Sequence, residues 1–168
     1  MILVVCGVSG SGKSTIGRLL ASRIGAEFLD ADDFHPPANI EKMAAGIPLD
    51  DADRAPWLAR LASEIDAHKS VGSDLVLACS ALRERYRHEL GVDEQCVMTV
   101  LLDGTAALIA SRLAARRHEF MPASLLQSQF DALERPVGGI TVDVAPEPEQ
   151  VVQSIIEQLT NRGVHRFA

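Results

Sequence analysis

The stretch "GVSGSGKST" at residues 7–15 follows a short apolar run, "ILVVC" at residues 2–6. Its glycines allow the backbone to approach an anion without a Cβ clash, so that successive N–H groups can converge on that anion. Residues 7–14 match the pattern G-x-x-x-x-G-K-[ST] in full. A plain Gly/Ser-rich turn is the alternative, but a buried strand before the pattern and a helix opening within it are what a phosphate-binding loop requires. The stretch therefore predicts such a loop.

Two side chains of this loop carry specific predictions. Lys13 supplies a full positive charge for the β- and γ-phosphates of a nucleoside triphosphate, and the Ser14 hydroxyl can ligate Mg²⁺. We therefore expect ATP and Mg²⁺ as cofactors, with Lys13 as a catalytic residue and Ser14 as a metal ligand. The loop residues expected to bind the nucleotide are Gly7, Ser9, Gly10, Ser11, Gly12, Lys13, Ser14 and Thr15.

The composition limits the class of protein. The chain has 168 residues, which fits one domain over residues 1–168, and its net charge of −7 without a Lys/Arg-rich block argues against nucleic acid as a partner. The run 2–6 is too short for a signal peptide, and no stretch reaches the roughly 18 apolar residues of a membrane span. Cys6, Cys79 and Cys96 lie in apolar runs without metal-ligand spacing, so we expect buried free thiols. A cytoplasmic protein without membrane contact is expected.

Apolar runs alternate with segments of helical periodicity along the chain. The apolar runs predict strands at 2–6, 26–30, 74–79, 96–102 and 139–144. Helical spacing predicts helices at 13–24, 82–90, 106–117, 123–133 and 149–159. This alternation indicates an α/β fold in which helices cover both faces of a parallel sheet, a three-layer α/β/α sandwich.

One segment, residues 36–68, interrupts this alternation with two consecutive helices. Pro36 and Pro37 suit the start of the first helix, and Asp50 suits the N-cap of the second. Apolar residues then recur on one face of the second helix. They are Trp57, Leu58, Leu61 and Ile65. Because open α/β sheets bind ligands at the carboxyl ends of their strands, we expect this helical insert to stand over that edge and to bind the substrate.

The type of phosphate chemistry follows from motifs that are missing. The chain lacks the N-K-x-D string that GTPases use for guanine, and the strand at 74–79 ends in Cys79-Ser80 instead of the aspartate of a Walker B strand. A single compact P-loop domain suffices for small-molecule kinases. We therefore expect a kinase with a small-molecule substrate.

Two carboxylates follow the second predicted strand. Asp30 and Asp32 are two residues apart, so in a strand both point to the same side, toward the phosphate loop. One can hold Mg²⁺, and the other can orient a substrate hydroxyl and accept its proton. A solvated acidic turn is the alternative, and Asp33 is expected to be a cap or solvated. His35 is either structural or, because it lies beside the pair, a substrate ligand.

Three arginines occur in "SRLAARRHEF" at residues 111–120. Arg112 and Arg116 are four residues apart and share one helix face, while Arg117 does not. Phosphoryl transfer needs cations over the γ-phosphate as charge develops there. We therefore expect a lid at residues 112–124, with Arg112 and Arg116 binding the nucleotide and Arg116 catalytic. A solvated basic face is the alternative.

Four segments together resemble the gluconate kinases, a family of small P-loop carbohydrate kinases. They are "GVSGSGKST" (7–15), the segment from "FLDADDFHPP" to "DDADRAPWL" (28–58), "CSALRERYR" (79–87) and "SRLAARRHEF…QFDALERP" (111–136). The resemblance implies transfer of phosphate from ATP to the 6-hydroxyl of D-gluconate. It also implies a five-stranded parallel sheet in the order 2-3-1-4-5, similar to nucleoside monophosphate kinases, and a homodimer.

The resemblance also assigns roles to individual residues. It implies that Asp32 binds the substrate hydroxyl and that Asp30 joins Ser14 at the metal. His35, Arg54 and Arg83 are implied to bind the substrate, with Arg54 suited to its carboxylate and alternatively an ion-pair partner of neighbouring aspartates. The adenine pocket is implied near residues 142–150. Trp57 is expected in the core, Tyr86 in packing and Arg87 at the surface.

Two other functions remain open from the sequence. One is a related kinase that acts on shikimate or another polyol acid, although "CSAL" stands where shikimate kinases have a Gly-Gly-Gly turn. The other is a nucleotide-binding regulator, which would need neither an acceptor base nor a lid. The chain departs from the family's usual pattern at Ala31, where glycine is frequent, and in the glycine-free "ARRHEF" (115–120).

Overall fold

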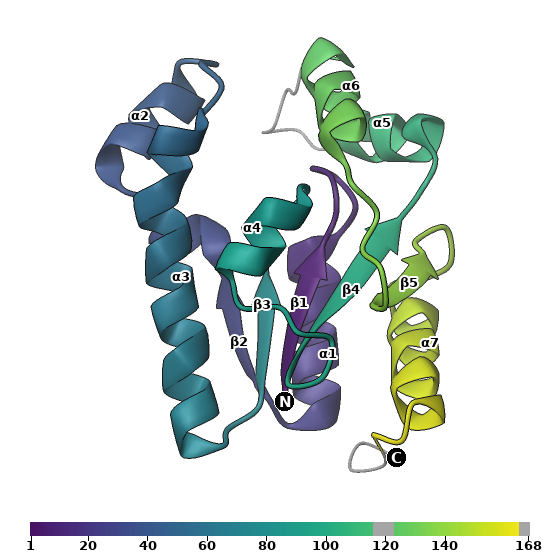
Figure 1. Cartoon of the computed structure of the whole chain (residues 1–168). Coiled ribbons are helices and arrows are strands. Elements are labelled where there is room, and N and C mark those ends of the chain that lie inside the picture. Colours follow the sequence, from purple (N-terminus) through teal and green to yellow (C-terminus); the bar gives the residue numbers. More distant parts are fainter. Residues whose placement is uncertain (116–122, 165–168) are drawn as a thin grey trace.

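The computed structural model describes residues 1–115 and 123–164 (Figure 1). Its sheet is parallel, and the strand order β2-β3-β1-β4-β5 confirms the predicted topology. The strands are β1 (Ile2–Cys6), β2 (Glu27–Asp30), β3 (Leu75–Ala78), β4 (Val97–Asp103) and β5 (Ile140–Asp143).

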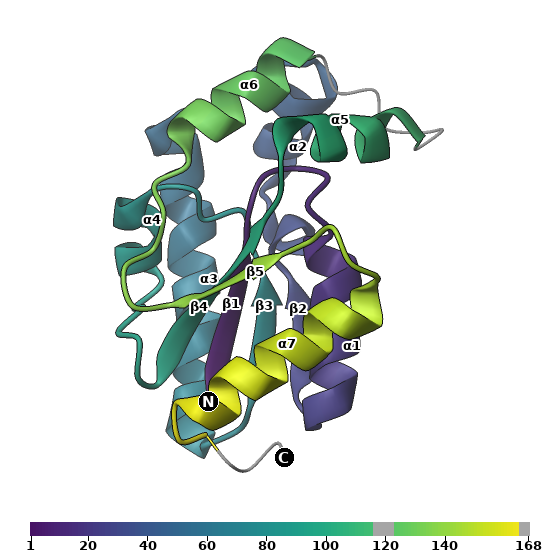
Figure 2. The ribbon, with the colours of Figure 1, turned by 90° about the vertical axis from the view of Figure 1, so that its right-hand side faces the viewer.

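Helices cover both faces of the sheet, which confirms the three-layer arrangement. Helices α1 (Lys13–Ile24) and α7 (Pro148–Asn161) lie on one face, the near one in Figure 2. Helices α3 (Asp51–Val71) and α4 (Glu84–Glu89) lie on the other. The remaining elements are the 3-10 helix η1 (Ala31–Phe34), α2 (Pro37–Ala44), α5 (Ala106–Ala115) and α6 (Ala123–Ala132). In Figure 1, α2, α5 and α6 stand beyond the carboxyl ends of the strands.

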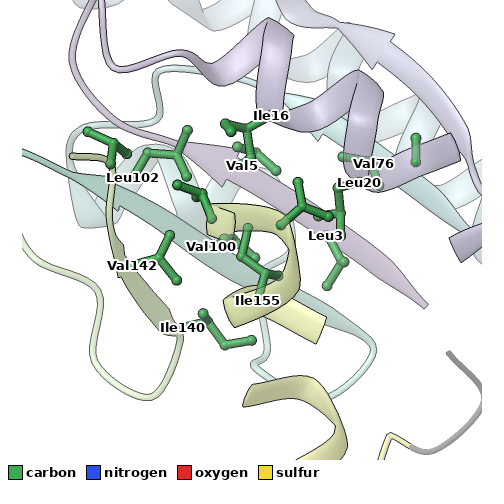
Figure 3. Packing of buried hydrophobic residues seen from close by; sticks show 14 of the residues in the cluster. Leu3, Val5, Ile16, Leu20, Val76, Val100, Leu102, Ile140, Val142 and Ile155 are labelled. Carbon is green, nitrogen blue, oxygen red and sulfur yellow. The ribbon is translucent and has the colours of Figure 1, made fainter. Parts of the chain in front are cut away.

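Strand β1 lies between two hydrophobic cores, one on each face of the sheet. Leu3 and Val5 pack toward α1 and α7 (Figure 3), whereas Ile2, Val4 and Cys6 pack toward α3. All five β1 side chains are buried because a central parallel strand has no solvent face. This explains why the run at residues 2–6 is apolar throughout, and it fixes the strand whose end carries the phosphate loop.

Helix α3 has a wider role than the sequence predicted. Its Asp50 N-cap and its four apolar residues are confirmed, but Leu61 and Ile65 pack on the sheet itself. The helix is therefore also the crossover between β2 and β3. Only α2 and the first turns of α3 stand beyond the sheet edge, so the expectation that the whole of residues 36–68 lies there was wrong.

Two smaller predictions were also wrong. The helix expected from residue 82 begins at Glu84, because Arg83 is the N-cap and has an extended backbone (φ −100°, ψ 148°). Cys96 is exposed, since it precedes β4 in a loop, whereas Cys6 and Cys79 are buried free thiols as expected. Within residues 1–115 and 123–164, no helix combines the length and the apolarity needed to cross a membrane.

A histidine–glutamate pair ties α3 to β2 at the end of the sheet opposite the phosphate loop. His68 Nδ1 lies 2.9 Å from the Glu64 carbonyl oxygen, and its Nε2 lies 3.2 Å from Glu27 Oε2. Burial lowers the pKa of His68, but these two acceptors outweigh it and raise the pKa above 6.5. The stabilisation is thus fully present below the unfolded pKa and is lost as pH rises through the folded pKa.

We predict that Glu27→Gln lowers the free energy of unfolding by up to about 1 kcal/mol at pH 5.5, because the Glu27 side chain is 61% exposed and screened by solvent. The loss should shrink above pH 8. Urea titrations at both pH values measure it, with Asp66→Asn on the exposed side of α3 as the control. A loss that grows with pH would contradict this account.

Candidate active site

The phosphate loop is shaped by two close approaches that exclude side chains. Gly7 has a φ of 147°, and a Cβ there would lie 2.8 Å from Ser11 Oγ and 2.9 Å from the Leu102 carbonyl oxygen. Gly10 has a φ of 82°, and its Cβ would lie 2.7 Å from Leu113 Cγ in α5. Only glycine satisfies both the dihedral angles and the space at these positions. The loop therefore has the shape that its sequence pattern predicts.

The loop presents donors for an anion. The Ile16 N–H bonds to the Gly12 carbonyl oxygen (2.8 Å), so the amides of the first turn of α1 have no acceptor within the helix. Within the described part of the chain, Ser11 Oγ is the one buried side-chain polar atom without a hydrogen-bond partner. Lys13 Nζ reaches back across the loop to the Val8 carbonyl oxygen (3.1 Å), and burial lowers its pKa. These groups fit a phosphate chain.

Two predicted metal ligands meet beside the loop. Strand β2 ends at Asp30, and Ser14 Oγ donates a hydrogen bond to Asp30 Oδ2 (2.6 Å). The donor set, one hydroxyl and one carboxylate, fits a Mg²⁺ ion that keeps most of its water ligands. Asp30 is thus the carboxylate that contacts Ser14, and its role as a metal ligand stays a prediction.

Asp32 lies next to this pair, but not for the reason expected. It belongs to η1 rather than to a strand, and its N–H donates to Asp30 Oδ1 (3.3 Å). Desolvation raises the pKa of Asp32 even though its side chain is 86% exposed, and the negative charge of Asp30 raises it further. Lys13 opposes this shift. The result is a carboxylate that is more basic than an ordinary aspartate.

His35 is held by a stack and a hydrogen bond. Its ring lies parallel to Trp57 (12°, centroids 4.3 Å apart), and Trp57 Nε1 donates to the Ala31 carbonyl oxygen (2.7 Å). Asn39 Nδ2 donates to the Asp53 carbonyl oxygen (2.9 Å) and lies 3.4 Å from His35 Nδ1. Because that amide nitrogen is a donor, Nδ1 must accept, and the proton of a neutral imidazole lies on Nε2.

The remaining Nε2 faces the acidic pair. It lies 3.9 Å from Asp32 Oδ1. Burial lowers the pKa of His35 and Arg54 lowers it further, which outweighs the opposite effect of Asp32. His35 is therefore neutral at pH 7 and presents an N–H donor beside the Asp32 carboxylate. Asn39, which fixes this tautomer, was missed by the sequence analysis, since nothing in "PPANIEKM" (36–43) distinguishes it from a solvated helix residue.

The two arginines that are predicted to bind the substrate lie on different elements. Arg54 Nη1 donates to the Leu49 carbonyl oxygen (2.6 Å), and its guanidinium lies 5.6 Å from the centre of the Tyr86 ring. The Tyr86 hydroxyl in turn donates to Asp51 Oδ1 (2.7 Å). The alternative for Arg54, an ion pair with a neighbouring aspartate, is thus not what holds it. Arg83 stands at the start of α4 with an exposed side chain.

Arg87, expected at the surface, is instead 4% exposed. Its Nη1 donates to the carbonyl oxygens of Ala81 (2.9 Å) and Leu82 (3.2 Å). These bonds hold the turn in which Ala81 has its positive φ. The buried guanidinium therefore shapes the segment that leads into Arg83.

A cavity of about 310 Å³ adjoins the loop on the other side. It is lined by the loop, α5 and the segment after β5, where the adenine pocket was expected. Arg112 lines it and donates from Nη2 to the Val144 carbonyl oxygen (2.6 Å). Part of the expected lid, residues 116–122, lies outside the described residues. Arg116 and Arg117 belong to this part.

A phosphate loop alone does not define the reaction. The metal–nucleotide complex is expected at Asp30 and Ser14, which leaves the second carboxylate, Asp32, for the acceptor. Its raised pKa and its position next to Lys13 and His35 suit an acceptor hydroxyl. The protein is a small-molecule kinase of the P-loop class.

Similarity to known proteins identifies the family within this class. Residues 2–136 match a family model described as an AAA domain. The chain is 42% identical to a gluconokinase of Arabidopsis thaliana over 95% of this chain and 93% of the relative. It is 45% identical to a gluconokinase of Gluconobacter oxydans (strain 621H) over 92% and 88%. The crystal structure of a gluconokinase from Sinorhizobium meliloti 1021 matches with a TM-score of 0.84 at 39% identity, covering 95% and 91%. The chain belongs to the gluconokinase family, which confirms the resemblance.

The stack of His35 on Trp57 gives the site its own reporter, because Trp57 is the single tryptophan of the chain. We predict that tryptophan fluorescence changes with pH at a midpoint below 6.5, since a protonated imidazole quenches the indole it stacks on and burial lowers the pKa of His35. His35→Gln should abolish the transition, whereas His68→Gln should keep it. A midpoint above 6.5 in the wild-type protein would be incompatible with the buried stack.

Proposed function

We propose that this protein transfers the terminal phosphate of ATP to the 6-hydroxyl of D-gluconate, giving 6-phosphogluconate. The observation that carries the proposal is the meeting of three groups at one end of the sheet. Ser14 bonds to Asp30 (2.6 Å), and Asp32, with its raised pKa, lies next to them. Membership of the gluconokinase family supports gluconate as the acceptor.

The donor nucleotide is held by the loop. The open amides at the start of α1, the Ser11 hydroxyl and Lys13 bind the phosphate chain, and Thr15 and Arg112 line the cavity that suits the rest of the nucleotide. Ser14 and Asp30 would hold a hydrated Mg²⁺ ion. When bound, this metal neutralises charge that develops on the transferring phosphoryl group. Arg116 is proposed to add a further cation there, as its position in the sequence suggests.

The acceptor hydroxyl is oriented by Asp32 and His35. The Asp32 carboxylate accepts a hydrogen bond from the hydroxyl and takes its proton as the oxygen attacks. The Nε2–H of neutral His35 donates to a hydroxyl of the same substrate, which keeps the acceptor beside Asp32. A guanidinium can grip a carboxylate with two parallel hydrogen bonds, so Arg54 and Arg83 are proposed to hold the carboxylate end of the substrate.

A cytoplasmic location is also proposed, on the ground of the composition and the free cysteines, and a homodimer is proposed on the ground of the sequence resemblance. Light scattering on the purified protein measures the mass in solution.

The substrate class is tested by ADP release with different acceptors. We expect release with gluconate and background rates with shikimate and nucleoside monophosphates. Release with shikimate or a monophosphate and none with gluconate would overturn the assignment. A nucleotide-binding regulator would release no ADP in excess of background with any acceptor.

The role of Asp32 is tested by Asp32→Asn, which keeps the shape and removes the base. We predict that kcat falls about 10²- to 10⁴-fold. The control is Asp33→Asn, the exposed neighbour, which should keep near-normal kcat. In the wild-type protein, kcat/KM should fall on the acid side with a midpoint above 3.8, because Asp32 must be ionised and its pKa is raised. Near-normal kcat in Asp32→Asn would remove the residue from this role.

A further inference from the structure

One side chain of α6 contacts the phosphate loop, and the sequence analysis did not single it out. Ser9 N–H donates to Gln129 Oε1 (2.7 Å), and Gln129 Nε2 donates to Ser9 Oγ (3.1 Å). Both residues are half-buried. The carboxamide of Gln129 thus holds both the main chain and the side chain of Ser9, which lies 120 residues away in the sequence.

The segment that follows α6 holds a second loop of the site, the turn that carries Arg83. Glu134 N–H donates to the Leu82 carbonyl oxygen (2.8 Å), and Glu84 N–H donates to Glu134 Oε2 (2.6 Å). These bonds fix the residues immediately before and after Arg83. Figure 2 shows this segment descending from α6 past α4 before it enters β5.

The segment between the two bridges is itself anchored. Phe130 packs against the core on the α1 side, and Leu133 packs against the core on the α3 side. Arg135 then forms a two-bond ion pair with Asp103 at the end of β4 (2.9 and 3.0 Å). Residues 129–135 therefore form a stiff connection between the phosphate loop and the turn that carries Arg83.

We propose that Gln129 and Glu134 are positioning residues that form a brace, which sets the phosphate loop at a fixed position relative to the Arg83 turn. The inference rests on the proposed function, in which the loop holds the donor phosphate and Arg83 holds the acceptor. Two substrates bound by separate loops react only while the loops keep a productive geometry, and a shift of about 1 Å can cost about a hundredfold in rate. The brace maintains that geometry without touching either substrate.

The first test cuts one end of the brace. Gln129→Ala should lower kcat about tenfold or more, while the Kd of Mg²⁺–AMPPNP and the Kd of gluconate, each measured alone by calorimetry, change less than about twofold. The matched control is Gln127→Ala on the same helix, because Gln127 Nε2 bonds to Asp131 of α6 itself (2.8 Å). Hydrogen–deuterium exchange in residues 123–132 of the nucleotide-free protein should accelerate in Gln129→Ala and not in the control.

The second test uses the other end. Glu134→Gln keeps an acceptor oxygen for the Glu84 N–H and should retain kcat, whereas Glu134→Ala should lower it. Because a brace fails when either end is cut, the double variant with Gln129→Ala should lose little more than the more severe single variant. Two independent contacts would instead multiply their losses.

The outcomes separate the brace from the proposed function. Unchanged kcat in Gln129→Ala, an equal loss of nucleotide affinity, or losses that multiply in the double variant overturn the brace alone. Failure of the wild-type protein to phosphorylate gluconate overturns the proposed function, and the same variants are then compared on the acceptor that is phosphorylated.

Discussion

The site depends on main-chain crowding around the phosphate loop. Gly7 lies so close to the Leu102 carbonyl of β4, and Gly10 so close to Leu113 of α5, that neither position has room for a Cβ. The loop is therefore shaped by the two elements that it packs between, before any ligand arrives. Donors that are already oriented need little reorganisation when charge develops on a phosphoryl group. The same packing means that the site forms only when the fold forms.

The acceptor side depends on a different kind of contact. Trp57 is buried, donates to the Ala31 carbonyl and stacks on His35, so the core of α3 reaches directly into the site. Ala31 lies between the two carboxylates. Its carbonyl fixes η1 against α3, and this contact aligns Asp30 and Asp32 with the helical insert. Trp57, which was expected only in the core, thus also fixes the position of the predicted metal ligand Asp30 relative to the helices that are predicted to bind the substrate.

How much could be predicted follows from the range of the interactions. The strands and the loop came from local patterns, because β1 is buried on both faces and the loop needs glycine at fixed positions. That Asp30 lies at the same edge as Ser14 followed from the topology, since the carboxyl ends of all parallel strands meet at one edge of a sheet, although β3 lies between β2 and β1. What was missed depends on side chains that contact another segment, on a buried guanidinium that holds a nearby turn, or on a local backbone exception. These are Asn39, Arg87 and Gln129, the turn at Ala81, and the 3-10 conformation of Asp32.

The balance of charge around Asp32 explains why its neighbour is a buried histidine rather than a lysine. A cation next to Asp32 stabilises the carboxylate and makes it a weaker base. Lys13 already acts in this direction, but burial and Asp30 outweigh it and the pKa of Asp32 is raised. Burial lowers the pKa of His35 and the charge of Arg54 lowers it further, against the opposing charge of Asp32, so the neutral ring can donate one hydrogen bond without adding positive charge. The site thus places the full charge of Lys13 at the loop, where the phosphate chain binds. It places the neutral donor His35 beside Asp32, where the proton has to leave the substrate.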